Sequence, residues 1–433
     1  MKVYPYPSAV AEKRVDAIIN RGLSFTKKEY QAVTRIIEDV KKNGDSAVVS
    51  YTNRFDSPLL TAESMEVSSL EIKEAGKRVD RSFISALNRA VSQIESFHER
   101  QLSNSWIHAD RPGVLLGQMI NPVDAAGIYV PGATGGKTPL VSSVLMGGIP
   151  ARIAGVNTTV MVTPPTREGE VDPHLIVAAQ KAGIHKIYKA GSAWGIAALA
   201  YGTETIPKVN VIVGPGNIYV TLAKKMVAGT VGIDMIAGPS EILVIADKTA
   251  NPEYIAADLL SQAEHDPLAS SILITDSKKI AELTRNAISK QLVELTRENI
   301  VRRSLADYGG IMIVSDIDSA IELANRIAPE HLELQVDNPF EYLGRIRNAG
   351  AVFLGSYTPE PVGDYMAGPN HVLPTAGTAK FASALSVDHF VKKTSMIYYS
   401  KEAFKKEAHD IMLLAKTEGL DAHAGSVKVR LKK

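Results

Sequence analysis

The middle of the chain carries three polar side chains at helical spacing, which together could bind a ligand or a metal ion. Asn251 followed by Pro252 is typical of a helix start, and Asp258, Gln262 and His265 then stand at intervals of four and three residues. Gln262 and His265 lie one turn apart on such a helix, close enough to hold one ion or one ligand. Taken alone, the spacing agrees better with a solvated helix face.

An adjacent glutamate and histidine, Glu330 and His331, follow a predicted helix whose apolar stripe includes Ile321, Ala324 and Ile327. A carboxylate beside an imidazole can relay protons near neutral pH, so the pair is a candidate for acid–base chemistry. Adjacent Glu–His pairs are also common by chance, and the local sequence does not decide the point.

A third group lies in the segment 362–371, which holds Asp364 and His371 among glycine and proline residues. The segment follows the last predicted strand, and α/β proteins place binding residues in such loops. His371 is equally suited to bracing the turn.

Near the end of the chain, Glu418 and His423 stand in a polar tail, where ordinary surface residues are the simpler explanation. Added to the groups above, they complete a set of amide, imidazole and carboxylate donors. Such oxygen and nitrogen donors suit Zn²⁺ or Mn²⁺. The residues by themselves therefore favour a metal-assisted enzyme.

Two glycine-rich turns raise the question of a nucleotide. The segment 213–217, Val-Gly-Pro-Gly-Asn, follows a predicted strand and precedes a helix, where a phosphate or ribose can approach the backbone. The full dinucleotide fingerprint would need a glycine in place of Tyr219, so an ordinary tight turn remains an alternative. A second segment, 130–138, is similar to a P-loop, but Pro131 stands where that motif requires glycine, which argues against an ATPase.

These groups need a scaffold, and the apolar pattern from about residue 114 predicts one. Short β-branched runs alternate with helical stretches, which indicates an α/β fold of parallel sheets covered by helices. Eight strands suit two such lobes better than one, with a boundary near 238–240. The chain before about residue 110 is mostly helical in pattern, and a helix at 401–417 with a basic end forms an appended tail. The predicted strands are 127–130, 159–162, 186–188, 209–213, 241–245, 271–275, 310–314 and 351–354.

Composition narrows the function classes. The chain of 433 residues has 48 Lys and Arg against 47 Asp and Glu, which argues against a nucleic-acid binder that relies on a broad basic field. The absence of cysteine excludes disulfides, iron–sulfur clusters, thiolate zinc sites and a cysteine nucleophile. No apolar run reaches ~18 residues, and the first residues lack the apolar core of a signal peptide. We therefore expect a cytoplasmic protein that binds neither nucleic acid nor membrane.

Together these motifs resemble the histidinol dehydrogenase family, which acts in the last steps of histidine biosynthesis. The resemblance covers nearly the whole chain, from the helical first segment to His423. Several long motifs in one order make chance similarity a poor explanation. The most specific stretches are VGPGNIYV (213–220), IDMIAGPSEILVIAD (233–247), SQAEHDPLAS (261–270), RIAPEHLELQV (326–336), GDYMAGPNHVLPT (363–375) and EGLDAH (418–423).

The resemblance implies a four-electron oxidation of L-histidinol to L-histidine through L-histidinaldehyde, with two NAD⁺ reduced. It implies Glu330 and His331 as the acid–base pair and a homodimer with shared active sites, in which the C-terminal tail reaches the partner's site. One Zn²⁺ per subunit would be held by Gln262, His265, Asp364 and His423. The substrate would contact these four residues together with Ser240, His331, His371 and Glu418, and NAD would contact Tyr129 and Asn217.

The implied fold consists of two Rossmann-like lobes, a helical N-terminal segment and a small C-terminal tail domain. We expect an N-terminal arm at 1–22. The first α/β domain would combine 23–127 with 241–385 and carry most metal and substrate residues. Residues 128–240 would form the second, NAD-binding domain, and 386–433 the tail domain.

The chain departs from the family pattern at 191–194, where Gly-Ser-Ala-Trp replaces Gly-Gly-Ala-Gln. The glutamine that contacts NAD in the family is thus replaced by Trp194. Its ring could stack on the nicotinamide or adenine of the cofactor, or pack away from it. The departure affects the expected cofactor affinity and leaves the expected reaction unchanged.

The alcohol oxidation and the aldehyde oxidation require different catalytic groups. His331 is expected to take the hydroxyl proton in the alcohol step, because its pKa lies naturally near the working pH. An aldehyde has no hydroxyl to deprotonate, and without cysteine a thiohemiacetal is excluded. Glu330 is therefore expected to activate water, so that a gem-diol gives the second hydride while zinc orients the substrate. Two alternatives remain, an enzyme of the same scaffold for another small alcohol and a non-catalytic metal-binding scaffold.

Overall fold

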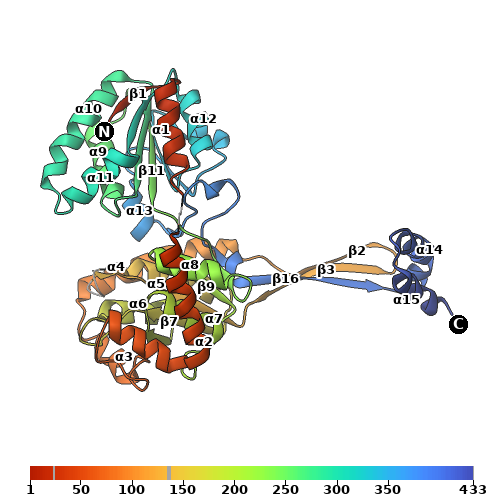
Figure 1. Cartoon of the computed structure of the whole chain (residues 1–433). Coiled ribbons are helices and arrows are strands. Elements are labelled where there is room, and N and C mark those ends of the chain that lie inside the picture. Colours follow the sequence, from red (N-terminus) through yellow and green to blue (C-terminus); the bar gives the residue numbers. More distant parts are fainter. Residues whose placement is uncertain (23–24, 134–137, 433) are drawn as a thin grey trace. The chain divides into compact units, whose positions relative to one another are not determined.

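The computed structural model of the chain describes residues 1–22, 25–133 and 138–432. Backbone contacts divide the chain into two compact units, whose elements are labelled in Figure 1. The first unit comprises Met1–Gln101 and Val123–Phe390, and the second comprises Leu102–Pro122 and Val391–Lys433. Among the described residues, no helix combines the length and the apolar character that a membrane span requires.

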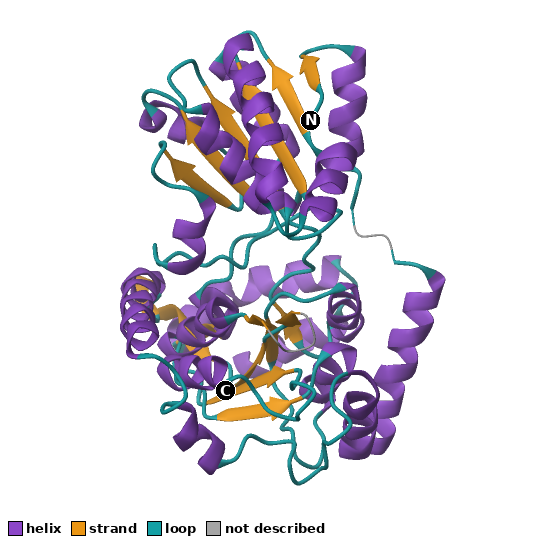
Figure 2. Cartoon of the chain, turned by 90° about the vertical axis from the view of Figure 1, so that its left-hand side faces the viewer, coloured by secondary structure: helices purple, strands orange, loops and turns teal. Residues whose placement is uncertain are grey.

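The first sheet of the first unit has six parallel strands in the order β1-β13-β12-β11-β14-β15. Helices cover both of its faces (Figure 2), and β11, β12 and β14 are buried at every residue. The strands span Val3–Pro5 (β1), Glu241–Ala246 (β11), Ser270–Thr275 (β12), Gly310–Ile313 (β13), His331–Gln335 (β14) and Ala351–Leu354 (β15).

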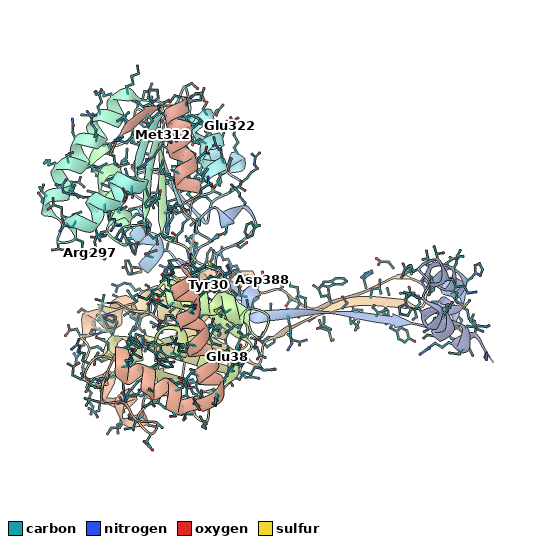
Figure 3. The ribbon with its side chains drawn as sticks, in the orientation of Figure 1. Tyr30, Glu38, Arg297, Met312, Glu322 and Asp388 are labelled. Atoms are coloured by element: carbon teal, nitrogen blue, oxygen red, sulfur yellow. The ribbon has the colours of Figure 1, made fainter. Side chains whose placement is uncertain are left out.

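Side chains alternate along β11 and so divide between two cores. Leu243 and Ile245 pack against helices α1 and α12, whereas Ile242 and Val244 pack against α9, α10 and α11. The helix α12 itself is amphipathic, and its Glu322, labelled in Figure 3, is exposed. These helices span Ala9–Ile19 (α1), Pro252–Ala263 (α9), Lys278–Gln291 (α10), Glu298–Tyr308 (α11) and Ile317–Ile327 (α12).

The second sheet has five parallel strands in the order β10-β9-β4-β7-β8. The chain starts at the middle strand, β4, builds outward to β8, and then returns to β9 on the other side of β4. Open α/β sheets bind their ligands at the carboxyl ends of the strands where the order reverses in this way. The strands span Ala125–Tyr129 (β4), Thr158–Thr163 (β7), Lys186–Lys189 (β8), Val211–Val213 (β9) and Gly232–Ile233 (β10), with a separate ladder of Gly132–Ala133 (β5) and Thr138–Pro139 (β6).

The helices of residues 27–98 pack around the second sheet, whereas the sequence led us to expect them with residues 241–385. Helix α2 packs on α7 and α8, and α4 packs on α5 and α6. The apolar stripe of α2, which includes Val33 and Val40, shares a core with Trp194 and Ile196, because α7 and α8 present an apolar surface that needs cover. The helices span Lys27–Phe55 (α2), Ser69–Ala75 (α3), Arg81–His98 (α4), Val141–Ile153 (α5), Pro173–Ala182 (α6), Ser192–Tyr201 (α7) and Ile218–Val227 (α8).

The second unit is a three-stranded antiparallel sheet with two helices. We expected a tail domain of 386–433, and the sheet also recruits residues 102–122, because β16 pairs with β3 along its whole length. The predicted helix at 401–417 is confirmed as α14. The elements span Trp106–Arg111 (β2), Val114–Pro122 (β3), Val391–Tyr399 (β16), Lys401–Thr417 (α14) and Asp421–Leu431 (α15).

The expected α/β class with two parallel-sheet lobes is confirmed. Strand β14, however, was not predicted. Its residues, His-Leu-Glu-Leu-Gln, alternate polar and apolar as in a half-exposed strand, yet all five are buried. The Glu330–His331 pair therefore stands at the start of a central strand.

Candidate active site

A cavity of about 340 Å³ lies at the amino ends of β11 and β14. Its lining combines titratable side chains from the first-sheet lobe with an apolar rim, Pro131, Leu140 and Pro215, from the second-sheet lobe. The structure thus brings most of the predicted substrate residues to one place. The polar lining includes Ser240, His265, Glu330, His331, Glu360, Asp364 and His371.

The ring of His331 has a defined tautomer. Its Nδ1 lies 2.9 Å from the backbone carbonyl oxygen of Glu241 on the neighbouring strand β11. Because a carbonyl oxygen can only accept, Nδ1 carries the hydrogen and Nε2 is the free nitrogen of the neutral ring. Burial lowers the pKa of His331 to about 4, below the near-neutral value that the sequence led us to expect. The ring is therefore neutral at physiological pH, and Nε2 is the atom that can accept a proton.

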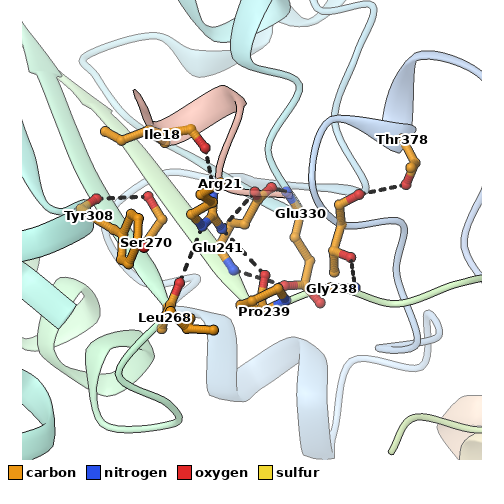
Figure 4. Close-up of polar contacts among 12 residues, drawn as sticks. Ile18, Arg21, Gly238, Pro239, Glu241, Leu268, Ser270, Tyr308, Glu330 and Thr378 are labelled. Atoms are coloured by element: carbon orange, nitrogen blue, oxygen red, sulfur yellow. Dashed lines mark hydrogen bonds and ion pairs between the residues drawn. The ribbon is translucent and has the colours of Figure 1, made fainter. Parts of the chain in front are cut away.

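Glu330 is fixed by the same strand (Figure 4). Its Oε2 accepts the backbone N–H of Glu241 at 2.9 Å, and its own N–H donates to Oε2 of Glu241 at 3.1 Å. Burial raises the pKa of the Glu330 carboxyl well above its usual range, and the nearby carboxylates of Glu241, Glu360 and Asp364 raise it further. A carboxyl group in this setting accepts a proton far more readily than an exposed glutamate.

Two acidic side chains face His331 from the short helix α13 (Glu360–Tyr365). Glu360 and Asp364 are four residues apart and so share one face of this helix. Oε1 of Glu360 lies 3.9 Å from Nε2 of His331, and ligand atoms of His331, Glu360 and Asp364 all lie within 4.8 Å of one another. One cation could contact all three. Burial raises the pKa of Glu360 to about 8, and the charge of Asp364 adds to the shift.

Gln262 and His265 come to the same region from α9. Gln262 is buried, and its amide group, oriented by its hydrogen-bond partners, donates to Oε2 and Oε1 of Glu360 at 2.9 and 3.1 Å. This arrangement leaves the amide oxygen for another partner. Helix α9 ends at Ala263, so His265 reaches the cavity from the turn beyond it.

The third member of the predicted helix stripe, Asp258, belongs to a network behind the cavity. Nε2 of Gln335 donates to Asp258 at 2.8 Å and to Glu333 at 2.9 Å. Oε1 of Glu333 in turn accepts the backbone N–H of Glu360 at 3.2 Å. Burial raises the pKa values of both carboxyl groups, Asp258 and Glu333. Through its hydrogen bond to the backbone of Glu360, the network fixes the first residue of α13.

His371 contributes a free nitrogen to the cavity. Within the described residues its Nε2 is buried and has no hydrogen-bond partner. Burial lowers its pKa, so the ring is neutral near physiological pH. A buried nitrogen without a partner costs free energy, which a bound polar ligand would recover.

The predicted cofactor residues Tyr129 and Asn217 lie at the reversal point of the second sheet. Tyr129 ends β4, and its hydroxyl oxygen accepts the backbone N–H of Ser192 at 3.1 Å. Asn217 caps α8 by accepting the N–H of Tyr219 at 3.0 Å. Gly214 between them has φ +117°, and a Cβ there would meet the carbonyl oxygen of Tyr129 at 2.1 Å, so the turn requires glycine.

Trp194 is part of the lobe's core and is only 4% exposed. Its ring stacks against Tyr51 and Phe55 at centroid distances of 5.9 and 5.7 Å, and its Nε1 donates to Oγ1 of Thr52 at 3.0 Å. The geometry favours packing over stacking on a cofactor ring. Of the segment similar to a P-loop, residues 134–137 lie outside the described part of the chain.

Glu418 and His423 belong to the second unit. Glu418 ends α14 as its C-cap, and His423 lies in the first turn of α15. Both side chains are exposed within this unit.

Sequence reasoning missed two residues of the site, Glu241 and Glu360. Each carried a signal. Glu241 is a charged residue at the head of an otherwise apolar strand, Ile-Leu-Val-Ile-Ala, and Glu360 stands one helical turn before Asp364.

Comparisons with known proteins agree with one another. The family model described as histidinol dehydrogenase matches residues 20–431. The chain is 55% identical over 425 residues to the histidinol dehydrogenase of Desulfotalea psychrophila, with 98% of each chain covered. It is 54% identical over 421 residues to that of Clostridium acetobutylicum, covering 97% of this chain and 96% of the relative. The crystal structure of histidinol dehydrogenase from Elizabethkingia anophelis is similar with a TM-score of 0.92 and 40% identity, over 100% of this chain and 98% of that one.

Proposed function

The chain belongs to the histidinol dehydrogenase family, a family of oxidoreductases, and on this premise we propose that it oxidises L-histidinol to L-histidine through L-histidinaldehyde, reducing two NAD⁺. One observation carries the proposal. A buried neutral imidazole, His331, has its Nε2 3.9 Å from the buried carboxyl group of Glu360 and near the half-buried Asp364, in a cavity that both lobes line. A substrate hydroxyl placed there meets a base whose accepting atom is unengaged.

This site is proposed to hold zinc. Three of the proposed ligands, Gln262, His265 and Asp364, come from one copy of the chain, and the fourth, His423, comes from a second copy. The residues present fit such an ion. Glu360 accepts the amide N–H groups of Gln262, so the amide oxygen of Gln262 remains available, and the carboxyl groups of Glu360 and Asp364 lie close together there. When bound, zinc would supply positive charge that anchors the substrate's imidazole and amino nitrogens.

In the alcohol step, His331 is proposed to accept the hydroxyl proton at Nε2 while the carbon-bound hydride passes to NAD⁺. The hydrogen bond from Nδ1 to Glu241 supports this role, because it fixes the ring orientation and stabilises the positive charge that develops on the imidazole.

In the aldehyde step, Glu330 is proposed to take a proton from water as the water oxygen adds to the aldehyde carbon. The adduct is the anion of the gem-diol, which then loses its carbon-bound hydrogen as a second hydride to NAD⁺. The product is the carboxylic acid, whose remaining hydroxyl proton is released to solvent as the carboxylate of L-histidine forms. The raised pKa of Glu330 supports the role, because the carboxylate is then a stronger base. The chain has no cysteine for a covalent alternative.

The cofactor is proposed to bind at the reversal point of the second sheet, near Tyr129 and Asn217. The strand order there and the glycine turn at 214–216 support this placement. Ser240 and His371 are proposed to contact the substrate. The partner copy of a homodimer is proposed to supply Glu418 and His423 from its second unit.

Counting NADH tests the proposal. Purified, zinc-loaded protein with L-histidinol and excess NAD⁺ should form two NADH and one L-histidine per histidinol consumed. NADH from other small alcohols alone would favour a related enzyme with a different substrate. No NADH from any alcohol would leave a metal-binding scaffold.

A further inference from the structure

A buried arginine from the N-terminal arm reaches the catalytic region. Arg21 follows helix α1, and its side chain is 2% exposed. Its guanidinium lies 2.7 Å from Oε1 of Glu241 (Figure 4) and also donates to the backbone carbonyls of Ile18, Pro239 and Leu268 at 3.1 to 3.3 Å. A planar guanidinium that is bonded on several sides has little freedom to move.

The pair continues directly to Glu330. Arg21 engages Oε1 of Glu241, and Oε2 of Glu241 accepts the backbone N–H of Glu330. The carboxylate of Glu330 returns to the backbone N–H of Glu241 through its Oε2. Oε2 of Glu330 is thus held by a hydrogen bond. Because the Glu330 side chain lines the cavity, Oε1 is the oxygen that remains to act on a molecule bound there. The orientation of Glu330 thus depends on where Glu241 is held.

Charge explains why an arginine is needed. Glu241 and Glu330 place two acidic side chains next to each other away from water, where like charges repel strongly. Without a cation, the Glu241 carboxylate would become protonated or its side chain would move, and either change would disturb the hydrogen bonds that orient Glu330. Arg21 is permanently charged and compensates Glu241, so that Glu330 is the carboxyl left to exchange protons.

We propose that Arg21 and Glu241 are positioning residues that hold the Glu330 carboxylate in the orientation needed to activate water in the aldehyde step. The inference rests on the proposed role of Glu330. It makes the N-terminal arm part of the catalytic assembly, and it predicts that loss of the arginine affects the second oxidation more than the first.

The experiment compares Arg21→Met, Arg21→Lys and Glu241→Gln with the wild-type enzyme. The alcohol step is followed with L-histidinol while semicarbazide traps the aldehyde, and the aldehyde step is followed with supplied L-histidinaldehyde. Arg21→Met should lower kcat of the aldehyde step about tenfold to a hundredfold, as expected for a misplaced catalytic group, and change the alcohol step less than threefold. Arg21→Lys should recover part of the loss.

Arg14 offers a matched control. It stands on α1 of the same arm and donates to the backbone carbonyls of Ala306, Asp307 and Gly309, away from Glu330. Arg14→Met should lower the unfolding temperature as Arg21→Met does, without changing the ratio of the two steps. Glu241→Gln keeps the shape of the side chain, so it tests the charge if Arg21→Met folds poorly.

A double-mutant cycle separates positioning from general damage. In a Glu330→Gln background, Arg21→Met should cause no further loss in the aldehyde step. A loss that simply multiplies with that of Glu330→Gln, or an equal fall of both steps in every Arg21 and Glu241 variant, would overturn the inference. A Glu330→Gln enzyme with an intact aldehyde step would instead remove the proposed role of Glu330 itself.

Discussion

His331 and Glu360 face each other across the cavity, with Nε2 of the imidazole 3.9 Å from Oε1 of the carboxyl group. The first residue of a central strand and the first residue of α13 thus bracket the space where a substrate hydroxyl is proposed to lie. The distance is too long for a hydrogen bond between the two, so both groups are free to bind a third.

Replacing His331 by Gln should remove the proposed proton acceptor of the alcohol step. We expect kcat with L-histidinol to fall at least about a hundredfold, the usual contribution of a general base. With a pKa of about 4, His331 stays deprotonated through the neutral range, so the wild-type activity should not show a protonation limb from this residue between pH 6 and 8. A pH–rate profile checks the expectation, and a limb near pH 6.5 that disappears in the variant would contradict it.

Replacing Glu330 by Gln should separate the two oxidations. The variant keeps the size of the side chain but cannot take a proton from water, so we expect L-histidinaldehyde to accumulate and NADH per histidinol to fall from two toward one. The wild-type aldehyde step should speed up as pH rises through the raised pKa of Glu330, since only the deprotonated form is a base. An equal loss in both steps would contradict the division of roles.

Replacing His423 by Ala should abolish tight zinc binding and activity together. Zinc content after dialysis measures the first, and His409→Ala in the same unit is a control that should retain both. Mixing His423→Ala and Glu330→Gln subunits should restore part of the activity, because one mixed site would combine an intact Glu330 with an intact partner tail. No recovery in mixed dimers would argue against a shared site.

Glu360 should make the stability of the metal-free protein depend on pH. Its pKa is about 8 in the folded chain against about 4.5 when exposed, so the folded state binds more protons between these values. The free energy of unfolding should therefore fall as pH rises from 5 to 8. Urea titrations should show a flatter dependence for Glu360→Gln, and an unchanged slope would mean that other groups dominate.

Trp194 should matter for folding more than for the cofactor. Trp194→Ala removes a buried ring and should cost about 3 to 5 kcal/mol of stability, as large-to-small core changes do. Trp194→Phe keeps most of the packing with Tyr51 and Phe55, so the KM for NAD⁺ should stay within twofold of the wild-type value. A large rise in KM with unchanged stability would place the ring at the cofactor.

The sequence predicted what local patterns encode. β-Branched runs between helical stretches gave both parallel sheets, and motif residues such as His265, Glu330, Asp364 and His371 do line one cavity. Strand β14 was missed because its alternation of polar and apolar residues is typical of a strand with one exposed face. In the structure its polar residues are buried, and Gln335 donates hydrogen bonds to Glu333 and Asp258.

Contacts between distant segments could not be predicted. Glu241 and Glu330 are 89 residues apart, and nothing in either segment alone indicates that their backbones and carboxylates exchange hydrogen bonds. The packing of α2 on α7 could not be predicted either, because it depends on which apolar helix surfaces are left exposed after both sheets have formed.

The strand position of His331 has one more consequence. His331 lies on a strand that is hydrogen-bonded to a neighbour on each side, so its backbone position is held firmly by the sheet. Groups on the six-residue α13 and the loop after it can shift with small backbone changes. Descendants of this enzyme that come to prefer a new alcohol should therefore accumulate their changes at 360–371, while the imidazole keeps its place.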